Sequence, residues 1–335
     1  MHAKQTHRIT LRHIAQKTGY SVNTVSKALR DAADISDLTK EYIRTTARHM
    51  GYVANDMASA LRSGFSNVLA LIISDISNPF FGILCKEIEQ QAARYNYTVI
   101  VFNTEENAQR EERAIRTALS KNVDGVLLTP SQHSAEGITL LQEMGKPCVL
   151  MGRYFPRQQT DAVLFDDEEG GFLAGKHLTD CGYRNLLMLN AVGNTSAQDR
   201  ANGFIRAVAQ TPEAKNRIVP LKSPLGGCSD ILRQEYEKEP FDAIFAFSDL
   251  LAMEAVCALD QMAIPFGQIG VAGFDDIQSR LALPMPLTSV GVDAAIFATT
   301  LVDLLMRRIS GDAEDFPQRI VLPVTLSVRN STKKE

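Results

Sequence analysis

The side chains near the N-terminus best suited to specific recognition are an amide and an ammonium group on one short segment. Asn23 can pair with the edge of an adenine, and Lys27 can donate hydrogen bonds to O6 and N7 of a guanine. Val22 can contact a thymine methyl group. All three point away from the apolar stripe Val25–Leu29, so one helix would present them together. The pattern favours a helix that contacts DNA bases, and a solvated polar face is the alternative.

The segment around these residues predicts two short helices joined by a tight turn. Apolar residues recur at helical spacing from Leu11, and Gly19 interrupts them where a positive φ costs a glycine nothing. Ala15 is small enough for two helices to cross, and Ser21 is a good N-cap for the second helix. This spacing predicts a helix-turn-helix with Val22–Arg30 as the recognition helix, and a plain helical hairpin is the alternative. Nearby hydroxyl groups could bind phosphates. The predicted DNA-contacting residues of this head are Thr10, Ser21, Val22, Asn23, Thr24, Ser26 and Lys27.

Charge is distributed unevenly along the chain. Residues 1–62 carry a formal charge of +5 and the remainder −9, although the whole chain has a charge of −4 and a pI near 5.9. A small basic head on an acidic body suggests that the head meets phosphates, whereas an ordinary solvated surface explains the same charges equally well.

From Val68 onward, short apolar runs alternate with amphipathic helical stretches. The predicted strands are Val68–Ser74, Tyr97–Asn103, Gly125–Thr129, Pro147–Met151, Asn185–Leu189, Phe241–Phe247 and Ile269–Phe274. Examples of the helices between them are Phe81–Tyr95, Glu105–Lys121 and Leu250–Met262. Such alternation predicts parallel sheets with helices on both faces, and the strands are too many for one open sheet, so we expect two subdomains.

Composition disfavours several other classes of protein. A hydrophobic fraction of 45% with 22% charged residues is globular, and no apolar run approaches the roughly 20 residues of a membrane helix. The sequence contains no dinucleotide-binding, Walker or nucleophile-elbow motif. The five cysteines and six histidines show no metal-ligand spacing, and the N-terminus lacks the apolar core of a signal peptide. We therefore expect a reduced, cytoplasmic protein with no enzyme active site, no cofactor and no metal.

Several stretches carry a further similarity, in the same order along the chain. In the head they are ITLRHIAQKTGYSVNTVSKALRD and MGYVANDMASALRSG. In the body they are VLALIISDISNPFFGIL, NVDGVLLTP, FDDEEGGFLAGKHL, DRANGF, AIFAFSDLLAMEA, IGVAGFDD and PLTSV. On these motifs the sequence resembles the lac repressor and galactose repressor (LacI/GalR) family of bacterial transcriptional regulators, over nearly its whole length.

The resemblance implies an all-α helix-turn-helix head (1–54), a hinge helix and linker (55–66) and an α/β body (67–335). The body would consist of two doubly wound parallel-sheet subdomains, like those of periplasmic binding proteins. The N-subdomain would span about 67–163 and 293–321, and the C-subdomain about 164–292 and 322–330. These boundaries are expectations from the family.

The resemblance also implies that Asn55–Ser63 folds into a hinge helix on DNA, with Leu61 wedged into the minor groove. An apolar side chain in that position unstacks a base step and kinks the duplex. The DNA-contacting residues expected in the hinge are Asn55, Ala58 and Leu61. Without the resemblance, Leu61 would be assigned to a linker packed on the body.

Paired doubly wound subdomains bind ligands in the cleft at the carboxyl ends of their strands, so residues that follow strands are candidates. The resemblance adds Phe80 and Phe81 as aromatic faces, and Arg200 and Asp275 as partners of ligand hydroxyl groups. The predicted effector-binding residues are Asp75, Phe80, Phe81, Arg153, Arg200, Phe245, Ser248, Asp249 and Asp275.

Structural roles stay open for several of these side chains. The two adjacent phenylalanines could be core residues, and Arg153 could pair with Asp166 or Asp167. Asp249 and Asp275 could each cap a helix.

The sequence is therefore expected to encode a repressor that binds a palindromic DNA operator as a homodimer and responds to a sugar-like effector. Its expected place is the bacterial cytoplasm, at the nucleoid. The alternatives are a cytosolic sugar-binding module or enzyme whose head does not bind DNA, and a regulator gated by a protein partner. Ile320–Val328 alternates with period two, which predicts a strand. No leucine heptads follow it, so we expect a dimer and not a tetramer.

Overall fold

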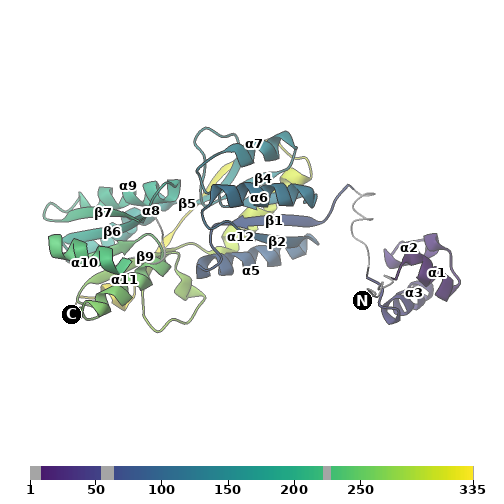
Figure 1. The fold of residues 1–335 in the computed structure, drawn as a ribbon, viewed down its shortest axis with the longest axis horizontal. Coiled ribbons are helices and arrows are strands. Elements are labelled where there is room, and N and C mark those ends of the chain that lie inside the picture. The colour runs from purple at the N-terminus through teal and green to yellow at the C-terminus, as the bar shows by residue number, and fades with distance from the viewer. Residues whose placement is uncertain (1–8, 54–63, 222–227, 335) are drawn as a thin grey trace, which may run out of the picture. The chain divides into compact units, whose positions relative to one another are not determined.

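The computed structural model describes residues 9–53, 64–221 and 228–334. The chain divides into two units, Met1–Ser66 and Asn67–Glu335, which we call the head and the body (Figure 1). No helix in the described part of the chain is long and apolar enough to cross a membrane.

The described residues of the head form the helices α1 (Leu11–Thr18), α2 (Val22–Leu29) and α3 (Asp37–His49). Helix α1 ends at Gly19, whose φ of +76° is easily adopted only by glycine. Ser21 begins α2, because its hydroxyl group accepts a hydrogen bond from the N–H of Thr24 at 3.0 Å. The buried core of the head consists of Ile14, Ala15, Val25, Ala28, Ile43 and Ala47. The predicted helix-turn-helix is therefore present.

Helix α3 leaves two large apolar side chains in solvent. Leu38 is 87% exposed and Tyr42 is 52% exposed. The buried face instead includes Lys40, whose ammonium group reaches Asp31 at 3.1 Å while its stem packs inside. A long amphipathic side chain can cover apolar surface in this way and leave a nearby leucine in solvent.

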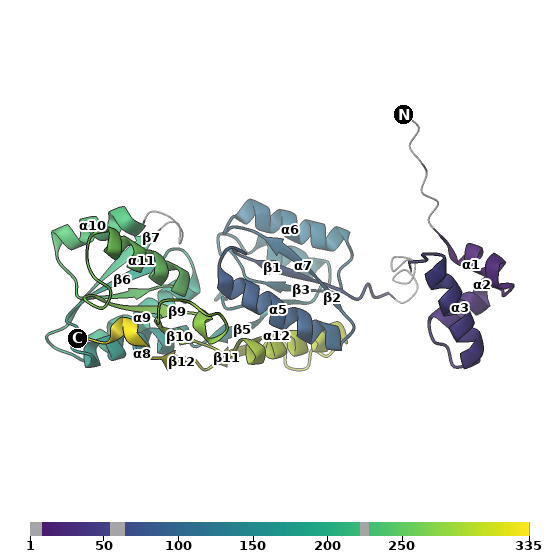
Figure 2. The same cartoon turned by 90° about the horizontal axis from the view of Figure 1, so that it is seen from below.

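The first part of the body is a six-stranded sheet with helices on both faces (Figure 2). Its strands are β1 (Val68–Ile73), β2 (Thr98–Asn103), β3 (Gly125–Leu128), β4 (Cys148–Met151), β5 (Asp161–Phe165) and β11 (Arg319–Leu322), in the spatial order β11-β5-β4-β3-β1-β2. All neighbours are parallel. Helices α5 (Pro79–Arg94) and α12 (Ala294–Ile309) cover one face, and α6 (Ala108–Ser120) and α7 (Glu136–Glu143) cover the other. We call this part the N-subdomain.

The second part, the C-subdomain, repeats this plan. Its strands are β6 (Asn185–Ala191), β7 (Lys215–Leu221), β8 (Ala243–Ala246), β9 (Gly270–Phe274), β10 (Thr288–Gly291) and β12 (Thr325–Ser327), in the order β12-β10-β9-β8-β6-β7. Helices α8 (Asp167–Asp180) and α9 (Thr195–Val208) cover one face, and α10 (Cys228–Lys238) and α11 (Asp249–Gln261) the other. Two 3₁₀ turns, η1 (Ile277–Ser279) and η2 (Asn330–Thr332), complete it. Only β12 is antiparallel to its neighbour.

The chain crosses between the subdomains three times, from β5 to α8, from β10 to α12 and from β11 to β12. The last crossing corrects one expectation. The alternating segment Ile320–Val328 forms two short strands in different sheets instead of one strand. The predicted fold class is confirmed: a helical head and an α/β body of two doubly wound, almost wholly parallel sheets.

Candidate functional site

The outer face of α2 presents the residues that the sequence assigns to base contacts. Val22 and Asn23 are exposed in its first turn, and Lys27 is half-buried one turn later. The hydroxyl groups of Ser21 and Thr24 hydrogen-bond to each other at 2.9 Å beside this end of the helix. The start of α2 therefore carries polar donors and one apolar side chain facing solvent.

Two other residues assigned to DNA lie differently. Ser26 is buried, because it follows Val25 on the side of α2 that faces the core, so its hydroxyl group does not face solvent with the other predicted phosphate-binding groups. Thr10 is exposed at the N-terminus of α1, and its N–H donates to Nδ1 of His13 at 3.2 Å. The hinge residues Asn55, Ala58 and Leu61 lie outside the described residues.

Lys27 already has an acidic partner within the head. Its ammonium group pairs with Asp34, and this hydrogen bond holds the pKa of that carboxyl below its usual value. Asp31 pairs similarly with Arg44 at 2.8 Å and Lys40 at 3.1 Å. The ammonium group of Lys27 is therefore already engaged within the head.

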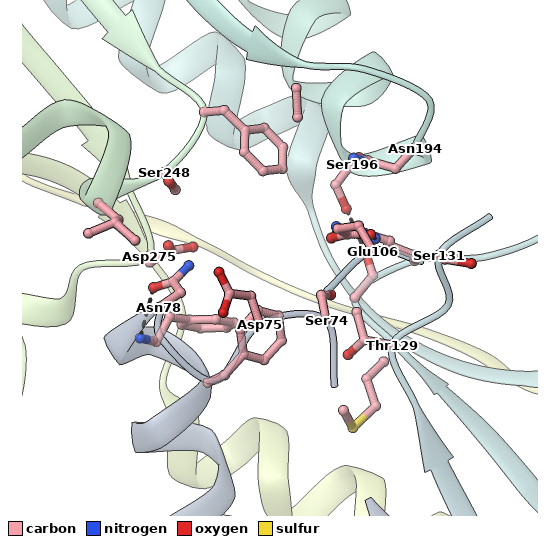
Figure 3. Close-up of a pocket in the computed structure, with 18 of the residues that line it drawn as sticks. Ser74, Asp75, Asn78, Glu106, Thr129, Ser131, Asn194, Ser196, Ser248 and Asp275 are labelled. Carbon is pink, nitrogen blue, oxygen red and sulfur yellow. Dashed lines mark hydrogen bonds and ion pairs between the residues drawn. The ribbon is translucent and has the colours of Figure 1, made fainter. Parts of the chain in front are cut away.

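The body contains a cavity of about 760 Å³ between its two subdomains (Figure 3). The residues that follow β1, β3 and β4 form one wall, and those that follow β6, β8 and β9 form the other. This is the crevice at the carboxyl ends of parallel strands where doubly wound sheets bind ligands. Its volume lies within the range of small-molecule sites.

Seven of the nine predicted effector residues line this cavity. They are Asp75, Phe80, Phe81, Arg153, Arg200, Ser248 and Asp275. Ser248 is at the same time the N-cap of α11, where its hydroxyl group accepts from the N–H of Leu251 at 3.3 Å. Phe80 packs edge-on against Phe81 at 5.4 Å between ring centres, so both serve the core and the cavity wall.

The other two predicted residues do not line the cavity. Phe245 lies inside β8, fully buried, with its ring centre 5.4 Å from that of Phe204. Asp249 is buried behind the cavity, where its carboxylate accepts from the N–H of Ile277 at 2.9 Å and the hydroxyl group of Ser289 at 2.5 Å. Burial raises the pKa of Asp249 to about 7. Neither side chain reaches the cavity in this structure, and both pack behind its wall.

Several lining residues were not predicted. They include Ser74, Glu106, Thr129, Ser131, Asn194, Ser196 and Phe247. Ser74, Thr129 and Phe247 directly follow β1, β3 and β8, but the predicted strands ran one residue further and included them. Glu106 and Ser196 lie further from the strand ends, and no signal in the sequence marks them.

Arg200 is held in place from three directions. Its Nε donates to Asp167 at 2.7 Å, and a terminal nitrogen donates to the carbonyl oxygen of Phe247. The guanidinium lies 3.4 Å from the ring centre of Phe274 and 4.5 Å from that of Phe247. Burial raises the pKa of Asp167 above its usual value, although the charge of Arg200 opposes this. Arg200 therefore lines the cavity in a fixed position, and its positive charge is already balanced by Asp167.

Asp275, unlike Arg200, has a buried polar atom without a partner among the described residues. It follows β9 with a φ of +113°, and its Oδ2 is buried without a hydrogen-bond partner among the described residues. Burial raises the pKa of Asp275 well above its usual value, against the charge of Arg200 and a hydrogen bond from Asn78. In Figure 3, Asp75, Asn78 and Asp275 lie toward one side of the cavity. A buried acceptor without a partner is costly, so this side is suited to a ligand that donates hydrogen bonds.

Arg153 pairs with neither of the acidic residues considered from the sequence. Its terminal nitrogens form two hydrogen bonds of 2.7 Å to the two carboxylate oxygens of Glu106, and a third of 3.0 Å to the carbonyl oxygen of Pro130. The side chain of Arg153 is more than nine-tenths buried. Arg153 thus lines the cavity as half of a bidentate ion pair.

Hydrogen bonds join the two subdomains at the rim of the cavity. Oε1 of Gln132 accepts from the N–H of Thr195 at 2.7 Å, and the hydroxyl group of Ser196 donates to the carbonyl oxygen of Gly152 at 2.8 Å. The two walls can therefore change their separation only if these hydrogen bonds break.

In the described residues, no group of histidine, cysteine or acidic side chains is placed to hold a metal ion.

A helix-turn-helix head joined to a two-subdomain body of this type defines a class of DNA-binding transcriptional regulators. Residues 10–55 match the family described as bacterial regulatory proteins of the lacI family. Residues 66–330 match periplasmic binding proteins and the sugar-binding domain of the LacI family. The chain therefore belongs to the LacI family of transcriptional regulators.

Individual relatives agree. The chain is 30% identical to the HTH-type transcriptional regulator DegA of Bacillus subtilis (strain 168), over 96% of this chain and 98% of that one. Its fold matches the lac repressor dimer bound to operator and the anti-inducer ONPF, with a TM-score of 0.82, 20% identity and coverage of 97% and 99%. It also matches a complex of the transcriptional regulator CelR with cellobiose, with a TM-score of 0.72, 24% identity and coverage of 97% and 100%. The relatives are regulators, and the chain is a transcription factor with a sugar-binding-type domain, not an enzyme.

Proposed function

We propose that this regulator represses transcription by binding a palindromic operator as a homodimer, and that a sugar-like molecule in the cavity changes its operator affinity. The observation that carries this proposal is the cavity itself, which opens between two subdomains of a chain that also has a DNA-binding head. We place this activity in the bacterial cytoplasm, where the chromosome lies at the nucleoid.

Specific recognition of the operator rests on α2 in this proposal. Asn23 contacts an adenine and Lys27 a guanine, while Ser21, Thr24 and Thr10 bind phosphates. Two heads, one from each subunit, contact the two half-sites. Asn55, Ala58 and Leu61 contribute from the hinge, where Leu61 kinks the central base step.

The proposed effector site uses both walls of the cavity. Asp75 and Phe80 come from the N-subdomain, and Arg200 and Asp275 from the C-subdomain. A sugar offers hydroxyl groups to the polar side chains and a C–H face to the aromatic rings. The CelR structure, which contains cellobiose, supports a sugar as the ligand class.

A ligand that contacts both walls favours one separation of the subdomains over another. The rim contacts of Gln132 and Ser196 would then form or break with the closure. The N-subdomain begins at β1, directly after the linker, so its displacement reaches the hinge through the chain itself. By linkage, DNA must change the effector affinity by the same factor that the effector changes the DNA affinity.

The test begins with selection of duplex DNA from a random pool by the full chain. We expect a palindromic consensus, and we expect Leu61→Ala to bind it more weakly and to bend it less. A sequence without two-fold symmetry, or equal affinity and bending in the variant, contradicts the proposed DNA complex.

The second half of the test is a thermal-shift screen of sugars, sugar phosphates and nucleobases, followed by DNA binding in the presence of each hit. A ligand at 100 times its Kd stabilises the folded chain by roughly 2.7 kcal/mol, which is readily measured. If no small molecule shifts both the melting temperature and the DNA affinity, a protein partner gates the regulator instead. If the chain binds no DNA specifically, it is a sugar-binding module.

A further inference from the structure

Both arginine side chains that line the described part of the cavity wall already have a carboxylate partner. Arg153 is bound by both oxygens of Glu106, and Arg200 is bound by Asp167. His133, the remaining basic residue described in the wall, is exposed. An anionic ligand would therefore find these guanidinium groups already neutralised.

The same wall also carries carboxyl groups that form no ion pair with the described residues. Asp75 accepts from the N–H of Ser77 at 2.9 Å and its hydroxyl group at 2.7 Å, and it forms no ion pair with the described residues. Asp275 forms no ion pair there either, and its Oδ2 has no donor. A hydroxyl group can donate to these oxygens or accept from a protonated carboxyl group, whereas an ionised carboxylate or a fully ionised phosphate group has no hydrogen to donate.

The backbone fixes Glu106 where it binds Arg153. Glu105 and Glu106 are consecutive residues with φ values of +52° and +54°, an uncommon conformation for side chains other than glycine. The N–H of Glu105 donates to the carbonyl oxygen of Ser74 at 2.6 Å, and the N–H of Asn107 donates to that of Thr104 at 3.1 Å. A turn held in this way is typical of functional loops, and it keeps the carboxylate at the guanidinium.

We propose that the effector is a polyhydroxylated molecule without an acid group, and that Glu106 determines this specificity by occupying Arg153. Sugar acids and sugar phosphates are excluded because they would have to displace a charged partner that forms two hydrogen bonds of 2.7 Å. This inference rests on the proposed function, since it names the ligand class of the same cavity.

The experiment measures binding of matched ligand sets to the full chain by calorimetry. Each set holds one sugar, its aldonic acid and its phosphate ester, drawn from common pentoses, hexoses and disaccharides. We expect at least one neutral sugar to bind, and the acid and phosphate of the same sugar to bind at least about tenfold more weakly.

Glu106→Gln tests the role of that side chain. It leaves Arg153 without its carboxylate, so we expect the variant to bind the acid or phosphate more tightly relative to the neutral sugar. Inorganic phosphate, at constant ionic strength, should raise its melting temperature more than that of the wild type. Glu112→Gln is the matched control, because it removes the same charge from an exposed pair with Arg116 outside this cavity. The control should keep the wild-type preference.

The outcomes separate the two proposals. An acid or phosphate that binds the wild type as tightly as its neutral sugar overturns this inference and leaves a small-molecule effector in place. An unchanged preference in Glu106→Gln, with no added response to phosphate, overturns the role of Glu106. If no member of any set binds the wild type, the sugar effector itself is wrong, and this inference fails with it.

Discussion

Lys27, which we propose contacts a base, is held by an ion pair within the head. Its ammonium group is paired with Asp34, so in the proposed complex the neutral O6 and N7 atoms of a guanine would compete with a charged acceptor. We expect Lys27→Ala to lose roughly 1–3 kcal/mol on the selected operator and less on random DNA. Competition titration against both duplexes measures this.

Lys17→Ala is the control for Lys27, because it removes the same charge from exposed surface at the end of α1. That variant should lose affinity about equally on both duplexes. Equal losses for Lys27→Ala as well would make Lys27 a phosphate contact.

Asp275 allows the cavity to be tested without unfolding the body. Asparagine keeps the shape of the side chain and tolerates a positive φ, and it removes a buried carboxylate whose pKa is raised by burial. We expect Asp275→Asn to melt no lower than the wild type. Its effector affinity should fall by about 10-fold to 150-fold, as expected for a lost hydrogen bond to a charged group.

Arg200→Ala is the less selective substitution. It would leave Asp167 buried without its cation, and breaking a buried pair costs about 3–5 kcal/mol. Asp275→Asn is therefore the variant that tests the site.

If Asp275→Asn binds the effector with the affinity of the wild type, Asp275 is not part of the effector site.

Asp249 predicts a pH dependence of stability. Burial raises its pKa to about 7, whereas an unfolded aspartate titrates near about 3.9. Between these values the folded chain keeps the proton that the unfolded chain has lost, so this contribution is fully present at lower pH and is lost as pH rises toward 7. The free energy of unfolding should therefore fall more steeply from pH 5 to 8 in the wild type than in Asp249→Asn. The difference should be on the order of 2 kcal/mol.

The slope, measured by urea unfolding at several pH values, is the readout for Asp249. Asparagine changes the absolute stability too, because one of the donors from Ile277 and Ser289 loses its acceptor. Parallel slopes for the two proteins would show that Asp249 is ionised in the folded chain across this range.

The sequence predicted which residues line the cavity better than it predicted the ion pairs that these residues form with one another. Positions after strands are readable from apolar runs, so Asp75 and Asp275 could be assigned to the cavity wall. Phe245 does not line the cavity, because its strand ends at Ala246 and Phe247 is the first residue after the strand to reach the cavity. The partner of Arg153 lies 47 residues away, and no local pattern encodes such a contact.

At the scale of helices, α8 and α9 are brought together by glycine. A Cβ on Gly203 would lie 1.8 Å from the carbonyl oxygen of Glu168, and one on Gly171 would lie 2.0 Å from that of Arg200. This close approach places Arg200 beside Asp167. We expect Gly203→Ala to destabilise the body by about 1–3 kcal/mol or more, because backbone atoms must move. Urea unfolding measures the change, and effector affinity should fall too.

Gly82→Ala provides the comparison for Gly203, since it lies in α5 with nothing within 4 Å of the added atom. It should stabilise the helix by roughly 0.5–1 kcal/mol. Similar effects of both substitutions would mean that the crossing of α8 and α9 adapts to a methyl group.

Most strands with an uninterrupted apolar run were predicted from the sequence, although β5 was missed despite its buried apolar residues 162–165. The strands β1 and β3 are fully or almost fully buried, and their sequences are wholly apolar apart from one glycine. Strand β7 was missed because it lies at a sheet edge, where polar side chains and Pro220 are tolerated. Strand β10 consists of small and polar residues whose burial is decided by its neighbours β9 and β12. In such strands the tertiary context overrides the local pattern.

At the scale of the whole molecule, the six-stranded sheet of the N-subdomain ends in two edge strands, β2 and β11. On β2, Ile100 is 37% exposed and Val101 is 40% exposed, and the outer side of the strand has no neighbour in its sheet. Apolar side chains on an open edge favour pairing with another chain. We expect this edge to contribute to the proposed homodimer, with a two-fold axis relating the two copies.

Val101→Lys should therefore dissociate the dimer. Light scattering at micromolar concentration should give a mass of twice 36.9 kDa for the wild type and a shift toward the monomer for the variant. Val321→Lys is the matched control, because Val321 is 51% exposed on β11 at the opposite edge of the same sheet. Operator affinity should fall by about 10²–10⁴ in the monomeric variant, since the second head is no longer held near its half-site. A monomeric wild type would contradict the palindromic operator, and a dimer that survives Val101→Lys would place the interface on another surface of the body.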